Sequence, residues 1–144
     1  MPESSTQTTA AHRFSLTIDG KRFEFFTRCT GLALSVDLDE FVEGGISDSV
    51  VQLPRHITYS PLVLARPVTR LTMETCRWVQ ESVRRPTRRT ARIACLNAAD
   101  AEVARWDLLN VMPVAWRGPA LDAEGTHLAM EEIELVHEGF LPLA

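Results

Sequence analysis

Histidine and cysteine are the residue types in this chain best suited to metal binding or catalysis, and their spacing favours neither role. The histidines form no HExxH arrangement and have no acidic or cysteine neighbours at metal-ligand intervals: His12, His56, His127 and His137. Three cysteines, an odd number at wide spacing, favour reduced buried thiols over a disulfide framework or a zinc site: Cys29, Cys76 and Cys95. We therefore predict no metal and no cofactor.

A group of glutamates near the C-terminus is the remaining candidate for acid–base chemistry: Glu131, Glu132, Glu134 and Glu138. Acid–base catalysis needs carboxyl groups that converge in a cleft, and the sequence does not place these in one. Gly44 and Gly45 lack the Lys-Ser/Thr of a phosphate loop, so they indicate backbone freedom rather than a nucleotide site. The chain is predicted not to be an enzyme.

The most concentrated charge is the segment RRPTRRTAR, which begins at residue 84. It contains no aromatic residue for base stacking, and the net charge of −4 gives no general attraction to nucleic acid, so no specific nucleic-acid binding is predicted. Two interpretations stay open, a solvated helix end and a charged contact with an acidic surface on another copy. The residues of that contact would be Arg84, Arg85, Arg88 and Arg89 on one side and Asp37, Asp39 and Glu40 on the other.

The 144 residues fit a single domain, expected over residues 12–144 with a flexible tail over residues 1–11. No apolar run approaches the roughly 20 residues that span a bilayer. The first residues show neither the basic start nor the apolar segment of an export signal. These features predict no membrane span and synthesis in the cytosol.

Period-two alternation predicts strands along the first half of the chain. Residues 13–18 and 22–26 flank Asp19-Gly20, which predicts a tight hairpin turn. Residues 32–39 alternate as well, and we expect one face of that strand in the core: Leu32, Leu34, Val36 and Leu38. Residues 57–65 form a further predicted strand, in which Pro61 indicates an edge or a bulge.

One helix is predicted, over residues 69–84, with Thr69 as its cap and Arg85-Pro86 as its end. Residues 91–96, 102–116 and 127–137 favour strands, with a turn over residues 97–100. A shift in the apolar phase predicts a bulge at Glu131-Glu132, with the acids facing solvent or a partner. The predicted fold class is mainly β, a curved antiparallel β-sandwich or barrel with one packed helix.

Five stretches occur in an order typical of one family: FSLTIDG, EGG, VQLPRHITYSPLVLAR, WDLLNVMPVAWRGPAL and MEEIELVHEGF. Over residues 12–140 the chain resembles the inner-tube proteins of contractile phage tails and bacterial contractile injection systems. The resemblance implies hexameric rings of this chain that stack into a hollow tube inside a contractile sheath. It also implies baseplate and tube-initiator proteins as partners, and a lumen that conveys cargo such as protein.

Under this resemblance, the segment after residue 42 is expected to contact the next ring: Glu43, Gly44, Gly45, Val50, Val51, Leu53, Pro54 and Arg55. Its glycines would let it order on assembly, and exposed strand edges would pair with a neighbouring subunit. The alternative is a surface hairpin that only connects two strands. A second group is expected in the core or at a seam between subunits: Trp106, Pro113, Trp116 and Glu132.

Other functions stay open on the sequence. A tube-initiator or terminator protein of the same fold would form single rings. A monomeric β-barrel would bind a small apolar ligand inside. The particle itself would be a phage tail or an injection machine, either kept in the cytoplasm or released.

Overall fold

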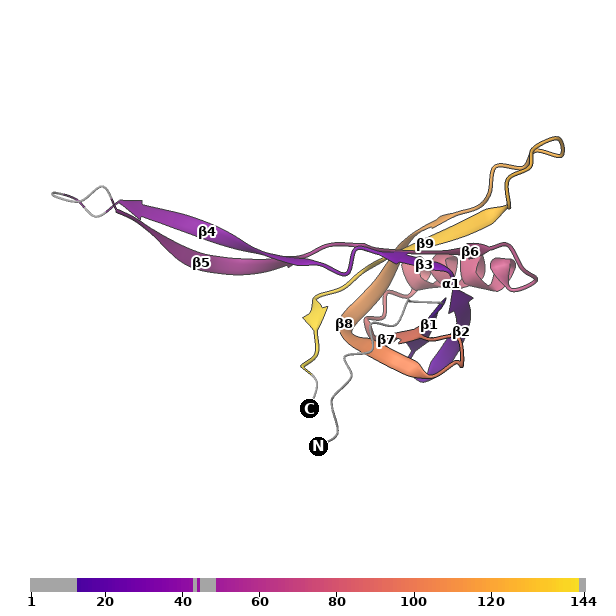
Figure 1. Cartoon of the computed structure of the whole chain (residues 1–144), viewed down its shortest axis with the longest axis horizontal. Helices are drawn as coiled ribbons and strands as arrows, with labels where there is room; N and C mark the ends of the chain where they lie inside the picture. The colour runs from indigo at the N-terminus through magenta and orange to yellow at the C-terminus, as the bar shows by residue number, and fades with distance from the viewer. Residues whose placement is uncertain (1–12, 43, 45–48, 143–144) are drawn as a thin grey trace, which may run out of the picture.

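A computed structural model describes residues 13–42, 44 and 49–142; Figure 1 shows a bent sheet beside one helix, with a long hairpin that projects from them. Within the described residues, the sheet has eight antiparallel strands in the order β2-β1-β7-β8-β9-β6-β3, and β10 pairs with β8. Its strands are β1 (Arg13–Ile18), β2 (Lys21–Phe26), β3 (Arg28–Thr30), β6 (Leu62–Pro67), β7 (Arg89–Leu96), β8 (Glu102–Arg117), β9 (Met130–Val136) and β10 (Gly139–Phe140). The hairpin is β4 (Leu34–Val42) with β5 (Val50–Tyr59), and the helix is α1 (Thr72–Arg84).

Strand β8 and the β2–β3 corner bend this sheet around its core. The first part of β8 pairs with β7 and the last part pairs with β9, with an irregularity between Pro113 and Ala115. At the other end, β2 pairs with β1 while β3 pairs with β6, and between them Thr27 donates its N–H to Ala65 O at 2.9 Å. The predicted curved antiparallel fold with one helix is confirmed.

Apolar side chains from the inner faces of the strands fill the interior. The fully enclosed cluster consists of Leu16, Ile18, Phe26, Leu62, Leu64, Ala91, Ile93, Leu108, Val111, Ile133 and Leu135. Helix α1 packs against this cluster through Trp78 and Val79, and the Trp78 ring lies 5.0 Å from the Phe23 ring on β2. The helix therefore covers the body through aromatic and aliphatic contacts.

The predicted turn and helix end are confirmed, and the predicted helix start is wrong. Asp19 and Gly20 both have positive φ, 48° and 78°, as the tight turn requires. The helix ends at Arg84, directly before Arg85-Pro86, but it begins at Thr72. Thr69 lies in the turn before it, where its hydroxyl accepts the Leu71 N–H at 3.1 Å, so this side chain bonds locally instead of capping the helix.

The predicted bulge at Glu131-Glu132 is also wrong. Strand β9 pairs with β6 in unbroken register from Met130 to Leu135, and Glu131 faces inward opposite Arg66. The irregularity lies across the sheet, in β8. The shift in apolar phase therefore comes from a buried glutamate on the core face and not from an extra residue in the strand.

Among the described residues, no helix has both the length and the apolar character needed to cross a membrane.

Candidate functional site: the projecting β4–β5 hairpin

The two-stranded hairpin is the feature that most distinguishes this chain from a closed monomeric barrel. Strands β4 and β5 pair in register from Leu34 opposite Tyr59 to Val42 opposite Val50, and within the described residues they pair only with each other. Figure 1 shows them extending well beyond the body of the molecule. An isolated pair of strands is marginally stable in water, and within the described residues no third strand joins this pair.

The half of the hairpin nearest the body has one apolar and one polar face. Facing pairs of an antiparallel ladder share a side, so the register places on one face the residues Leu34, Val36, Leu38, Pro54 and Ile57. The opposite face carries two ion pairs, His56 Nε2 to Asp37 Oδ2 at 2.6 Å and Arg55 Nε to Asp39 Oδ2 at 3.3 Å. We call these the apolar face and the polar face.

Beyond its base, the apolar face is largely exposed, which corrects the expectation that Leu34, Val36 and Leu38 face the core. Leu32 does pack against the core cluster, as expected, whereas about half of Leu34, Leu38 and Ile57 is exposed (52%, 51% and 48%). Toward the tip, further large apolar side chains are exposed: Phe41, Val42, Val50, Val51 and Leu53. In the β4–β5 register, Val42 and Val50 continue the apolar face, whereas Phe41, Val51 and Leu53 lie on the side of Asp39, so exposed apolar side chains lie on both faces near the tip. Exposed apolar surface of this kind is typical of interaction sites.

The segment predicted as a stacking loop is largely strand. Residues 50–55 belong to β5 because their backbone pairs with β4, and this register outweighs the loop tendency of Pro54. Gly44 lies beyond the end of β4, where an added Cβ would meet no atom within 4 Å. Glu43 and Gly45 lie outside the described residues. The predicted contact residues that the structure describes therefore lie in the paired part of β5 and at the tip of the hairpin.

The base of the hairpin is fixed to the body by two contacts that the sequence analysis missed. Gly31 has a φ of +95°, and a Cβ there would lie 2.0 Å from Pro61 O, so the backbones approach as closely as glycine allows. On the other side, the Tyr59 ring lies 5.3 Å from His137 and 5.6 Å from Phe140. Gly31 itself was the only signal of this junction in the sequence.

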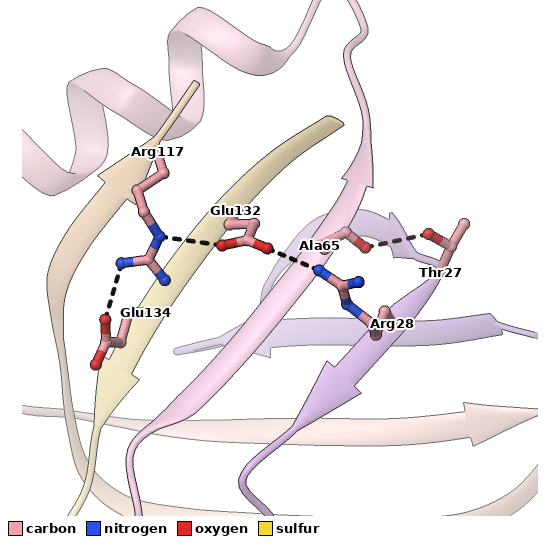
Figure 2. Close-up of polar contacts among 6 residues, drawn as sticks. All are labelled: Thr27, Arg28, Ala65, Arg117, Glu132 and Glu134. Atoms are coloured by element: carbon pink, nitrogen blue, oxygen red, sulfur yellow. Dashed lines mark hydrogen bonds and ion pairs between the residues drawn. The ribbon is translucent and has the colours of Figure 1, made fainter. Parts of the chain in front are cut away.

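The residues expected in the core or at a seam lie in the body, away from the hairpin. Pro113 is buried and Trp106 packs against the core cluster. Trp116 is partly buried, and its indole N–H meets no acceptor within the described chain. Glu132 accepts from Arg117 Nε at 3.0 Å and from Arg28 Nη2 at 2.7 Å, so both of its oxygens are occupied within the subunit, as Figure 2 shows.

The predicted charged contact is one between two copies, so it stays a prediction, and the structure shows only where its residues lie within one subunit. Asp37 and Asp39 are already paired on the polar face of the hairpin. Across the body, Arg88 pairs with Glu138 and Arg89 Nε lies 3.5 Å from Asp19 Oδ2. Arg84 and Arg85 instead line a surface hollow at the end of α1.

Within the described residues, His, Cys, Asp and Glu form no group of three that could hold a metal ion. His137 is buried with its Nδ1 3.3 Å from Gly139 O, and burial lowers its pKa below the ordinary histidine value. Cys29 is free, and burial raises the pKa of its thiol to about 11. A thiol with a raised pKa carries little thiolate near neutral pH, and the thiolate is the nucleophilic form.

The family profile of the T4-like virus tail tube protein gp19 matches residues 10–141. The chain belongs to this tail tube family. Within the family, this chain is a structural component of the tail tube of contractile injection systems. No curated protein matches it.

Solved structures share the tail tube fold at low sequence identity. The tube complex of an extracellular contractile injection system, "PVC sheath-tube complex in extended state", aligns with a TM-score of 0.80 and 20% identity, over 95% of this chain and 92% of that one. A chain of the anti-feeding prophage baseplate aligns at 0.74 and 24% identity, over 92% and 93%. A chain of the anti-feeding prophage tube-terminating cap aligns at 0.72 and 19% identity, over 92% and 89%. The fold is thus shared by tube, baseplate and cap chains.

Proposed function

We propose that this tail tube protein forms homohexameric rings that stack into the inner tube of a contractile particle, and that the hairpin joins one copy to another. The observation that carries this proposal is the uncovered apolar face of β4–β5. The hairpin is too long and too exposed to be stabilised by its own subunit, so a second copy that covers the apolar face supplies the missing burial.

The backbone supports the same arrangement. Within the described residues, β4 and β5 each leave one edge without a strand partner. A neighbouring copy can satisfy such an edge by adding a strand. The hairpin of one copy would contact a different surface on the next copy, which makes the contact heterologous. Such contacts form rings or propagate along a stack. Glu40 and the tip residues would lie at this contact, with the polar face left toward solvent or lumen.

The proposed partners follow from this assembly. A contractile sheath would enclose the tube, and a baseplate with a tube initiator would begin it. The similar chains come from a sheath–tube complex and from a baseplate, which supports this proposal. The lumen would convey cargo, and the chain itself would have no catalytic role. Synthesis would take place in the bacterial cytoplasm, and the finished particle would be a phage tail or an injection machine.

Two neighbouring substitutions on opposite faces of β4 test the proposal. Val36→Asp places a charge on the apolar face, whereas Ser35→Asp places the same charge on the polar face one residue away. Both positions are exposed, so both variants should fold. Negative-stain electron microscopy across a concentration series should show stacked six-fold rings for the parent chain and for Ser35→Asp, and none for Val36→Asp. Tubes of normal length from Val36→Asp would overturn the role of the hairpin.

A tube terminator is the second candidate, because a "sheath/tube terminator" chain aligns with a TM-score of 0.76 over 92% of this chain. Discrete rings that never stack, at any concentration and with a baseplate seed present, would favour it. A ligand-binding barrel lacks support, because apolar side chains fill the interior of the sheet. A chain that stays monomeric at high concentration would bring that alternative back.

A further inference from the structure

The arginines of this chain divide into a paired set on the sheet and hairpin and an unpaired set beside the helix. Carboxylate partners within the described residues are found for Arg13, Arg28, Arg55, Arg66, Arg88, Arg89, Arg92, Arg105 and Arg117. In the same part of the chain, none is found for Arg22, Arg70, Arg77, Arg84 and Arg85. Arg22 rests on the Phe25 ring. The remaining four lie on α1 or immediately next to it.

Two of these unpaired arginines line a hollow of about 680 Å³ where α1 ends against the sheet. Besides Arg84 and Arg85, the lining consists of Trp78, Glu81, Ser82, Thr87, Arg89 and Val111. Arg89 is paired with Asp19 and Glu81 adds one carboxylate, so Arg84 and Arg85 are the cations of the hollow that have no carboxylate partner among the described residues. The volume is that of an ordinary ligand site, large enough for a few side chains of a peptide. Arginine prefers planar, bidentate acceptors, so a carboxylate group fits this lining.

We propose that this hollow is a docking site for an acidic segment of a protein other than this chain. The acidic strand β4 of a second copy is a poor occupant, because Asp37 and Asp39 already hold His56 and Arg55. Nucleic acid is a poor occupant as well, because Trp78 is the one aromatic side chain in the lining and its ring already packs on Phe23, so the hollow offers no row of aromatic rings on which successive bases could stack. The inference goes beyond the stacked tube and does not depend on it, since the hollow is formed within a single subunit.

Removal of the two charges tests the site against a matched pair of arginines. Arg84→Gln/Arg85→Gln removes two unpaired charges from the hollow, and Arg70→Gln/Arg77→Gln removes two unpaired charges outside it. The net charge of both variants is therefore the same. Thermal unfolding followed by circular dichroism confirms that both variants fold before binding is measured.

The binding probe is a fluorescein-labelled peptide of eight glutamates, measured by fluorescence anisotropy with the full chain at low salt. An octaglutamine peptide controls for non-ionic binding, and a dT8 oligonucleotide tests for phosphate. The hollow variant should bind octaglutamate at least about fivefold more weakly than the parent, and the control variant within about twofold. An equal loss in both variants, or no binding by the parent chain, would overturn the proposal. Tighter binding of dT8, lost in the same variant, would overturn the choice of a protein partner. Ring and tube formation, followed separately by microscopy, keeps this result distinct from the proposed function.

Discussion

Arg66 and Glu131 face each other across β6 and β9, with Arg66 Nε 3.1 Å from Glu131 Oε1 and both side chains almost fully excluded from solvent. The same guanidinium donates from Nη2 to Thr75 Oγ1 at 2.8 Å, and its Cζ lies 4.8 Å from the centre of the Phe26 ring. One arginine thereby connects two strands of the sheet, the helix and β2. This network fixes how α1 sits on the body.

Breaking this pair from one side should destabilise the fold strongly. Glu131→Leu leaves a buried guanidinium without its carboxylate, which should lower the free energy of unfolding by about 3–5 kcal/mol. Replacing both partners, as in Arg66→Met/Glu131→Leu, removes the uncompensated charge and should restore most of that loss. Urea unfolding of the two variants measures the difference. If the double variant is as unstable as the single one, the pair does not stabilise by mutual neutralisation.

The sequence could not predict this pair because its partners lie 65 residues apart. MEEIELV shows two acids in succession, and consecutive residues of a strand point to opposite faces, so one acid had to face inward if the strand was regular. We predicted a bulge instead because the apolar phase shifts between Met130 and Ile133, and an extra residue in the strand would produce such a shift. Only the β6–β9 register supplies that partner.

Cys29 should react very slowly in the folded subunit. It packs against the core cluster, and burial raises the pKa of its thiol from 9.0 to about 11. Because the thiolate is the nucleophile, two pKa units reduce the reactive fraction at pH 8 by about a hundredfold. Iodoacetamide labelling, quantified by peptide mass spectrometry, should therefore be about a hundredfold slower in the folded chain than in urea. Equal rates in both conditions would show that this thiol is exposed.

Gly31→Ala should destabilise the junction between hairpin and body. The added methyl would lie 2.0 Å from Pro61 O at a residue with φ +95°, so the backbone must move and strain is added as well. We expect a loss of more than about 2 kcal/mol, seen as a lower melting temperature. Gly44→Ala is the matched control, because its Cβ meets no atom within 4 Å, and it should change stability by less than about 0.5 kcal/mol. Equal melting temperatures would contradict the close approach at Gly31.

The hairpin shows both the reach and the limit of sequence patterns. Alternation in residues 32–39 predicted the strand and its two faces correctly, since a period of two is a property of the backbone. It could not show what covers the apolar face, because Val36 and Leu38 look the same whether their own chain or another copy packs on them. The exposure of Leu34, Val36 and Leu38, where the alternation predicted burial, is therefore the main support for the proposed interface.

His137 should make stability depend on pH near neutrality. Burial lowers its pKa below the ordinary histidine value of about 6.5, so the folded chain binds fewer protons than the unfolded chain as the pH falls below that value. The stabilisation from the neutral imidazole is fully present above pH 6.5 and is lost progressively below it. Urea midpoints at pH 5, 6 and 7 should fall more steeply for the parent chain than for His137→Gln. Parallel profiles would contradict this assignment.

The same protonation should loosen the hairpin before it unfolds the body. The His137 ring packs on Tyr59, the last residue of β5, and on Phe140 of β10, so a charge placed there acts at the base of the hairpin. Amide hydrogen exchange between pH 7 and 5.5, corrected for intrinsic rates, should therefore lose protection first at Ser60, whose N–H bonds Ala33 O, and later at Leu64. Simultaneous loss at both amides would show that His137 acts on the whole fold and not on the junction.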